Sequence, residues 1–376
     1  MNDHPRADAR IALIDTAPPP LLGSALAQRL RDGGLPLQQR APQEQAERWH
    51  SHRLGGRTYQ FAQPITFTPY ASARACSARC RFCSENLRDA QAAQPASTLR
   101  PAHDYFTGLG QALEALRGVP LSYSLSGLEA SDDPDWLLRL LATLSAPESA
   151  AFIEQRVLYS NGAGLAGPRG EELLGALRAF GLSWLELSRH HPDAAVNQQI
   201  MRFRAGETIA DADVFAQTTR RMAAYFPLRM VCLLQAGGVD SPASVERYLE
   251  WARNLGAECV IFRELSRLDE GYRANATYRY LQSQRVPLEE LLLACLNSPS
   301  LGPALTPLGL TDGYYFWNLR LRHRSGLEVI FECSDYRTMH ARHAEGRVYK
   351  LVYFADGQLC AGWQPGRDLL LDTRHG

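Results

Sequence analysis

The chain has 376 residues, which is enough for one large domain, or a core with appended elements, and for a sizeable hydrophobic interior. Its 40 basic and 40 acidic residues give a formal net charge of zero, so no overall field attracts it to nucleic acid or to an anionic membrane. No apolar run is long enough to span a bilayer, and the opening MNDHPRADAR lacks the apolar segment of a secretory signal. We therefore expect a cytoplasmic protein, in which clustered cysteines serve metal binding or catalysis more often than disulfides.

Residues 1–61 are predicted to form a short N-terminal extension. A strand is expected at IALI, residues 11–14, and a helix near residues 20–32. The rest of this segment is rich in glutamine, arginine and proline and contains no motif that indicates chemistry.

Residues 62–268 alternate short apolar runs with amphipathic stretches. Strands are expected at residues 64–70, 120–127, 155–162, 182–189, 228–235 and 258–265. The intervening segments have helical patterns, and one of them begins with Asp133 as a natural N-cap and Pro134 as a natural first helical residue. Six strand–helix repeats favour a parallel sheet of an α/β protein. The count predicts a partial (β/α)6 TIM-like barrel, with its site at the carboxyl ends of the strands.

Residues 269–376 no longer alternate. Two hairpins are expected, with turns at residues 324–326 (RSG) and 355–357 (ADG). We interpret this region as a β-rich C-terminal cap that contributes to substrate binding.

Three cysteines follow the first predicted barrel strand with the spacing C-x3-C-x2-C: Cys76, Cys80 and Cys83. A structural zinc ion usually takes four ligands, and the chain has no second C-x2-C pair. Disulfide bonding would leave one thiol of the three over. Three thiolates on a four-iron cluster would leave one iron open to an outside ligand, which indicates chemistry on a bound molecule.

The cysteine motif, with Phe82 directly before its third cysteine and a (β/α)6 pattern around it, resembles that of the radical S-adenosylmethionine (SAM) superfamily. The resemblance covers roughly residues 62–268 and is closest to the branch that contains the molybdenum-cofactor cyclase. It implies a [4Fe–4S] cluster held by the three cysteines, with SAM bound to the open iron. It also implies reductive cleavage of SAM to a 5′-deoxyadenosyl radical, fed by an external electron donor of the flavodoxin or ferredoxin type.

The same resemblance implies which residues contact SAM. They are Phe82, Gly127, Glu129, Asn161, Ser188, Arg202 and Gln235. Glu129 ends a Gly-Gly-Glu-like motif in which Ser126 replaces the first glycine, and its carboxylate suits the SAM ammonium group. Arg202 is a candidate for the SAM carboxylate, together with Arg204. Phe82 is expected beside the adenine.

The predicted function is therefore hydrogen abstraction from a small-molecule substrate, in natural-product or cofactor biosynthesis. One alternative is modification of a ribosomally made peptide. An alternative of another class is an iron–sulfur electron carrier or sensor, which would bind iron without cleaving SAM. No residue indicates the reaction that follows SAM cleavage.

Overall fold

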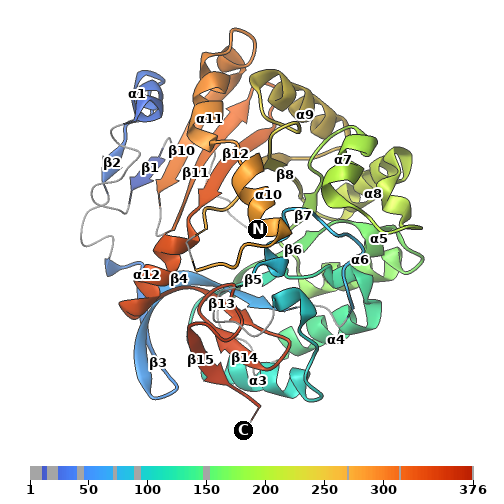
Figure 1. Ribbon diagram of the computed structural model, residues 1–376, viewed down its shortest axis with the longest axis vertical. Coiled ribbons are helices and arrows are strands. Elements are labelled where there is room, and N and C mark those ends of the chain that lie inside the picture. Colours follow the sequence, from blue (N-terminus) through green and yellow to red (C-terminus); the bar gives the residue numbers. More distant parts are fainter. Residues whose placement is uncertain are drawn as a thin grey trace.

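The computed structural model is a mixed α/β fold built on one large sheet (Figure 1). It describes residues 11–14, 24–39, 46–70, 74–88, 95–146, 153–268, 271–312 and 315–374. Six neighbouring parallel strands follow one another in chain order at the centre of the sheet. They are β4 (Arg57–Pro69), β5 (Leu121–Leu125), β6 (Ile153–Ser160), β7 (Trp184–Ser188), β8 (Leu228–Leu234) and β9 (Cys259–Glu264). All six predicted strands are confirmed, and β4 begins seven residues earlier than expected.

Helices connect these strands and form an arc outside them (Figure 1). They are α3 (Tyr105–Ala115), α4 (Pro134–Leu144), α5 (Ala163–Ala166), α6 (Gly170–Phe180), α7 (Ala194–Met201), α8 (Ala212–Tyr225) and α9 (Pro242–Asn254). Asp133 caps α4, as predicted, by accepting a hydrogen bond from the Trp136 amide, and Pro134 is the first helical residue. Gly181 and Gly256 follow α6 and α9 with positive φ angles, which end the helices at little steric cost.

Alternate strand residues face these helices. Tyr123 of β5 stacks on Phe180 of α6 with ring centroids 6.3 Å apart. Phe262 of β9 likewise contacts Tyr248 of α9, at 5.5 Å. Successive side chains of a strand point to opposite faces, so the residues between these belong to the other face, which we call the inner face of the sheet.

The C-terminal strands do not form a separate layer. They are β10 (Leu305–Asp312), β11 (Phe316–His323), β12 (Glu328–Ser334), β13 (Arg347–Tyr353), β14 (Gln358–Cys360) and β15 (Leu369–Asp372). The two predicted hairpins are confirmed as β11–β12 and β13–β14. Their strands also extend the sheet, because β12 pairs with β9 and β13 pairs with β4, both in parallel. The expected cap is thus continuous with the sheet on both flanks of the six strands.

Three helices accompany the C-terminal strands, and the N-terminal strands join the sheet in two places, at its β10 end and along β4. The helices are α10 (Ala276–Gln284), α11 (Leu288–Asn297) and α12 (Tyr336–Ala344). The N-terminal elements are β1 (Ile11–Ile14), α1 (Ala25–Asp32), β2 (Gln38–Gln39) and β3 (Trp49–Leu54). The expected strand and helix are present, and β1 pairs with β10. The β3–β4 hairpin was not anticipated. The strand order runs from β15 to β2 without the two ends pairing, so the sheet is open among the described residues.

No helix in the described part of the chain is both long and apolar enough to cross a membrane.

Candidate functional site: the cysteine loop and its surroundings

The cysteine loop leaves the carboxyl end of β4 and is held by backbone hydrogen bonds to the end of α7. The amide of Arg79 donates to the carbonyl of Met201 at 3.0 Å, and the amide of Arg81 donates to that of Ile200 at 3.1 Å. Ala78 forms an isolated antiparallel bridge with Phe203. These contacts fix the loop at the carboxyl ends of the parallel strands, where an α/β sheet binds its ligands.

The three cysteines of the loop are free thiols and half-buried. Burial raises the pKa of Cys76 and of Cys83 to about 12, and it raises the pKa of Cys80 well above its ordinary value. Cys76 and Cys83 also raise the pKa of Cys80, so the three sulfur atoms lie close enough to interact electrostatically. A bound cation reverses this effect, because coordination to a metal deprotonates a thiol outright.

The residues present fit an iron–sulfur cluster better than one metal ion. Among the described residues, no group of three or more His, Cys, Asp or Glu side chains is arranged to hold a single ion. A [4Fe–4S] cluster uses a different iron for each thiolate, and a loop with three free, neighbouring thiols supplies that donor set.

Glu129 lies next to this loop and ties two strand ends together. It follows β5, is 4% exposed, and accepts hydrogen bonds from four donors. The Ser131 hydroxyl donates at 2.6 Å and its amide at 3.2 Å; the Ser160 hydroxyl donates at 2.8 Å and the Asn161 amide at 2.5 Å. Burial nevertheless raises the pKa of Glu129 above its ordinary range. A carboxylate has about four acceptor positions, two on each oxygen. Oε1 of Glu129 receives the Ser131 and Ser160 donors, whereas Oε2 receives only the Asn161 amide, so one acceptor position is left on Oε2.

Asn161 connects Glu129 to the cysteine loop. Its amide nitrogen Nδ2 donates to the Ser77 hydroxyl at 2.9 Å and lies 3.6 Å from Cys76 Sγ, while its Oδ1 accepts from the Ala163 amide. The structure therefore brings Cys76, Glu129 and Asn161 into one network. Hydrogen bonds to the sulfur ligands of an iron–sulfur cluster shift its reduction potential, and Asn161 provides such a donor to Cys76.

The backbone geometry at position 127 requires a glycine. Its φ of +117° lies in a region that favours glycine, and a Cβ atom would stand 2.9 Å from the ring of Tyr70. The predicted glycine position thus has a steric reason in the chain, at the turn that presents Glu129.

Phe82 contacts His190, a residue that the sequence analysis did not identify. The two rings meet edge to face with centroids 4.7 Å apart. Nδ1 of His190 accepts a hydrogen bond from the Leu233 amide at 3.0 Å, so the ring proton is on Nε2. Burial lowers the pKa of His190 to about 3, and its Nε2 is buried without a partner among the described residues. A neutral buried donor beside the cysteine loop is therefore available to a ligand.

The remaining predicted SAM contacts lie at the carboxyl ends of β7 and β8 and at the end of α7. Ser188 is the last residue of β7 and is half-buried. Arg202 is exposed and has a left-handed backbone, with φ of 53°. Gln235 is 1% exposed, accepts a hydrogen bond from the Tyr280 hydroxyl and donates to the Leu233 carbonyl. The amide of Gln235 is thus engaged with α10, which the sequence did not indicate.

A partly buried ionic network lies on the inner face of the sheet beyond these residues. Arg263 of β9 forms an ion pair with Glu332 of β12 and lies 3.7 Å from Glu186 of β7. Buried charged groups are costly unless they are paired, and Arg263 offsets the charge of both acids, although Oε2 of the buried Glu186 has no hydrogen-bond partner among the described residues. No pattern in the sequence indicates that these three residues share one face.

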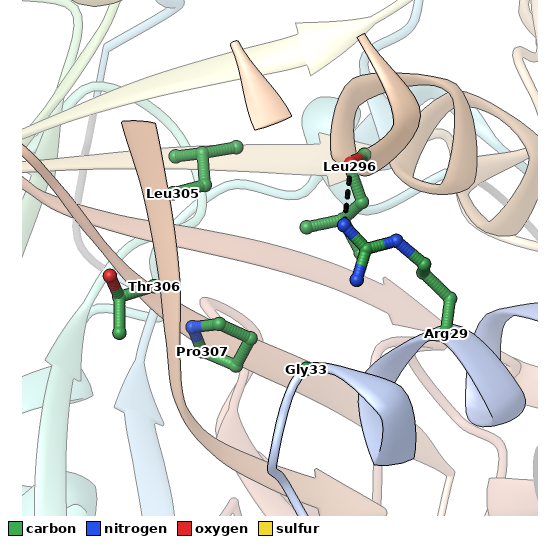
Figure 2. Close-up of a pocket in the computed structure, with 6 residues that line it drawn as sticks. All are labelled: Arg29, Gly33, Leu296, Leu305, Thr306 and Pro307. Carbon is green, nitrogen blue, oxygen red and sulfur yellow. Dashed lines mark hydrogen bonds between the residues drawn. The ribbon is translucent and has the colours of Figure 1, made fainter. Parts of the chain in front are cut away.

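Two surface hollows lie away from the cysteine loop. The first, of about 190 Å³, lies between α1, α11 and β10, and Figure 2 shows Arg29 of α1 there, donating to the Leu296 carbonyl at 2.9 Å. The second, of about 440 Å³, is lined by residues of the loop after β7 and of α9, including His191 and Trp251. Neither includes a predicted site residue.

Phe82 provides the first test of this site. The cysteine motif implies that Phe82 lies beside the adenine of SAM, so we expect Phe82→Ala to weaken SAM binding about tenfold. Cluster assembly should persist, because the cysteines are unchanged. The half-buried ring should contribute less than the roughly 3 kcal/mol typical of a fully buried phenylalanine. Equilibrium dialysis with SAM and denaturant unfolding of the same variant separate the two effects. A loss of about 3 kcal/mol or more in folding stability, with SAM affinity intact, would assign Phe82 to the core.

Solved structures with a similar fold come from radical SAM enzymes. The anSMEcpe enzyme with bound S-adenosylmethionine is 10% identical, with 83% of this chain and 79% of that chain covered at a TM-score of 0.50. SuiB of Streptococcus suis bound to S-adenosylmethionine is 13% identical, with 83% and 64% covered and a TM-score of 0.46. Methylornithine synthase (PylB) is 13% identical, with 53% of each chain covered and a TM-score of 0.34.

The similarity is one of structure. No protein-family model and no curated protein matches the sequence. The chain spans between 39% and 64% of the length of the SuiB chains that it matches. At 10% identity the match to anSMEcpe establishes the fold alone. The chain thus has the fold of the radical SAM enzymes, as the cysteine motif predicted.

Proposed function

We propose that this protein is a radical SAM enzyme whose partial barrel holds a [4Fe–4S] cluster on Cys76, Cys80 and Cys83. The observation that carries the proposal is the position of three free thiols on one loop at the carboxyl end of the first of six parallel strands. The fold match to anSMEcpe with bound S-adenosylmethionine supports it. When bound, such a cluster supplies the electron that cleaves SAM and releases the 5′-deoxyadenosyl radical.

The residues of the chain have distinct tasks in this proposal. The three cysteines ligate the cluster, and Asn161 fixes Cys76 through its side-chain amide. Glu129 orders the ends of β5 and β6, and its remaining acceptor position serves the SAM ammonium group. Ser188 and Arg202 serve the SAM carboxylate. Gly127 and Gln235 complete the SAM site, the first through close backbone approach and the second at the end of β8.

The proposed reaction is hydrogen abstraction from a small-molecule substrate, in natural-product or cofactor biosynthesis. Modification of a ribosomally made peptide is the alternative within the same class. An external donor of the flavodoxin or ferredoxin type would reduce the cluster. Arg79 and Arg81 of the loop are exposed, and their positive charges would attract an acidic electron carrier of this type.

SAM cleavage tests this proposal directly. We expect the anaerobically reconstituted protein to form 5′-deoxyadenosine from SAM when dithionite is added, as measured by chromatography. The thiolate-bound cluster is the only electron relay that this mechanism requires, so a variant with all three loop cysteines replaced by alanine is the matched control and should form none. Iron binding without 5′-deoxyadenosine would instead favour an electron carrier or sensor.

A further inference from the structure

Lys350 is the only lysine of the chain, and the other 39 basic residues are arginines. It lies on β13, pairs in register with Thr66 of β4, and is 5% exposed. Lysine is among the residue types that are least often buried. Because every other basic residue is an arginine, a buried lysine at this position indicates a function that an arginine could not perform.

The side chain of Lys350 points to the inner face of the sheet. Tyr353, three positions further along β13, contacts Tyr105 of α3 at 5.3 Å and therefore faces the helices. Positions that differ by an odd number face opposite sides of a strand, so Lys350 faces inward. Arg263 and Glu85 both shift the pKa of Lys350, although five strands separate β9 from β13 in the sheet. The inner face therefore curves enough to bring its two flanks within electrostatic reach.

The amine of Lys350 lacks a polar partner in the part of the chain that the structure describes. Its Nζ stands 4.3 Å from the ring centroid of Trp363, and no hydrogen bond or ion pair joins it to another described residue. Burial, followed by Arg263, lowers its pKa to about 7. The acids of the inner face are engaged elsewhere, because Glu332 and Glu186 surround Arg263. Glu85 is the remaining acid that Lys350 senses, and it is buried next to Cys83.

Burying an ammonium group whose three N–H donors have no hydrogen-bond acceptor is costly, unless a ligand accepts hydrogen bonds from them. Without a bound ligand, a buried lysine can lose its proton and become neutral, whereas a buried arginine would remain charged. We propose that Lys350 binds a carboxylate group of the substrate on the inner face of the sheet. One amine matches a monoanion, and Glu85, the acid that acts on Lys350, would add repulsion for the second charge of a phosphate. Trp363 covers one side of the amine.

This inference deepens the proposed function and rests on it only in calling the carboxylate that of a substrate. The carboxylate of SAM is assigned above to Ser188 and Arg202, which lie at the ends of β7 and α7. Lys350 lies beside β4, on the far flank of the six strands.

A single lysine makes the test specific. We would treat the reconstituted protein with formaldehyde and cyanoborohydride, which methylate unprotonated amines, and cleave it after arginine for mass spectrometry. The α-amino group of the same chain is the internal reference. Acetate, as a probe, should slow methylation of Lys350 about tenfold at saturation and leave the reference unchanged, because a bound anion both covers the amine and keeps it protonated. Acetamide, of the same shape without the charge, should have no effect.

Three results would overturn the inference. Equal protection by acetamide would show that the charge of the ligand is irrelevant. Absence of methylation at Lys350, under conditions that label the α-amino group, would show that small molecules do not reach it. Protection by SAM alone, without acetate, would assign the site to SAM. Acetate protection in a protein that forms no 5′-deoxyadenosine would keep the carboxylate site and reject the proposed function, so the two failures are distinguishable.

Discussion

Replacing any one of Cys76, Cys80 or Cys83 by alanine should abolish the cluster and, with it, SAM cleavage. The reconstituted wild-type protein should contain about four iron and four sulfide per chain, as one [4Fe–4S] cluster requires. Each single variant should lose most of this iron and the broad visible absorption of thiolate-bound iron, because a cluster with two protein thiolates is poorly held. Iron and sulfide assays, together with absorption spectra, measure the effect.

Cys295 provides the matched control. It lies on α11, is fully buried and packs among leucines, so Cys295→Ala should retain the cluster. Cys333 and Cys360 lie on strands at opposite flanks of the sheet. A count near eight iron would show that these three cysteines build a second cluster. A triple loop variant that still binds four iron and cleaves SAM would contradict the proposed ligands and the function together.

Glu129→Gln is expected to affect SAM affinity and folding at the same time. The substitution removes a charge-assisted bond to the SAM ammonium group, worth about 1.5–3 kcal/mol, so affinity should fall by about one to two orders of magnitude. The NH2 group of the new glutamine would also point at the hydrogen-bond donors of Ser131 and Ser160 or at that of Asn161, which donate to the carboxylate in the wild-type protein. An unsatisfied buried donor costs about 1–3 kcal/mol, and folding stability should decrease by about that amount.

Asp132→Asn is the control for this experiment. Asp132 lies three residues further along the chain, and its Oδ2 accepts a hydrogen bond from the Ser77 amide at 2.6 Å. It should share the loss of stability without the loss of SAM affinity. Isothermal titration with SAM and denaturant unfolding distinguish the two roles. Glu129→Gln with unchanged SAM affinity would leave Glu129 a purely structural residue, and the ammonium contact would belong to another group.

The sequence predicted those features that arise from local patterns. Each of the six central strands has an apolar run and a following helix with recognisable ends, such as Asp133 before α4 and Gly181 after α6. The cysteine loop was identified because its ligand spacing lies within eight residues. The pairing of β12 with β9 and of β13 with β4 could not be predicted, since hairpin patterns carry no information about which distant strand lies beside them.

The surroundings of the site show the same limit. That Glu129 contacts Ser131 follows from their separation of two residues, but its bonds to Ser160 and Asn161 depend on the neighbouring positions of β5 and β6. His190 and Lys350 carry no motif, and only their burial shows that they differ from surface residues of the same type. The uniqueness of Lys350 among 40 basic residues was visible in the sequence and would have been a useful signal.

The pairing of β4 with β13 has a consequence for how the chain is made. Strand β4 begins at Arg57, and its partner β13 begins at Arg347, so the two are synthesised almost 300 residues apart. Until residues 328–353 have left the ribosome, β4 and β9 each present a row of unpaired backbone groups, which is a template for aggregation. Such distant pairing also slows folding. Production in a heterologous host should therefore improve with slower translation at low temperature and with chaperones that shield sheet edges.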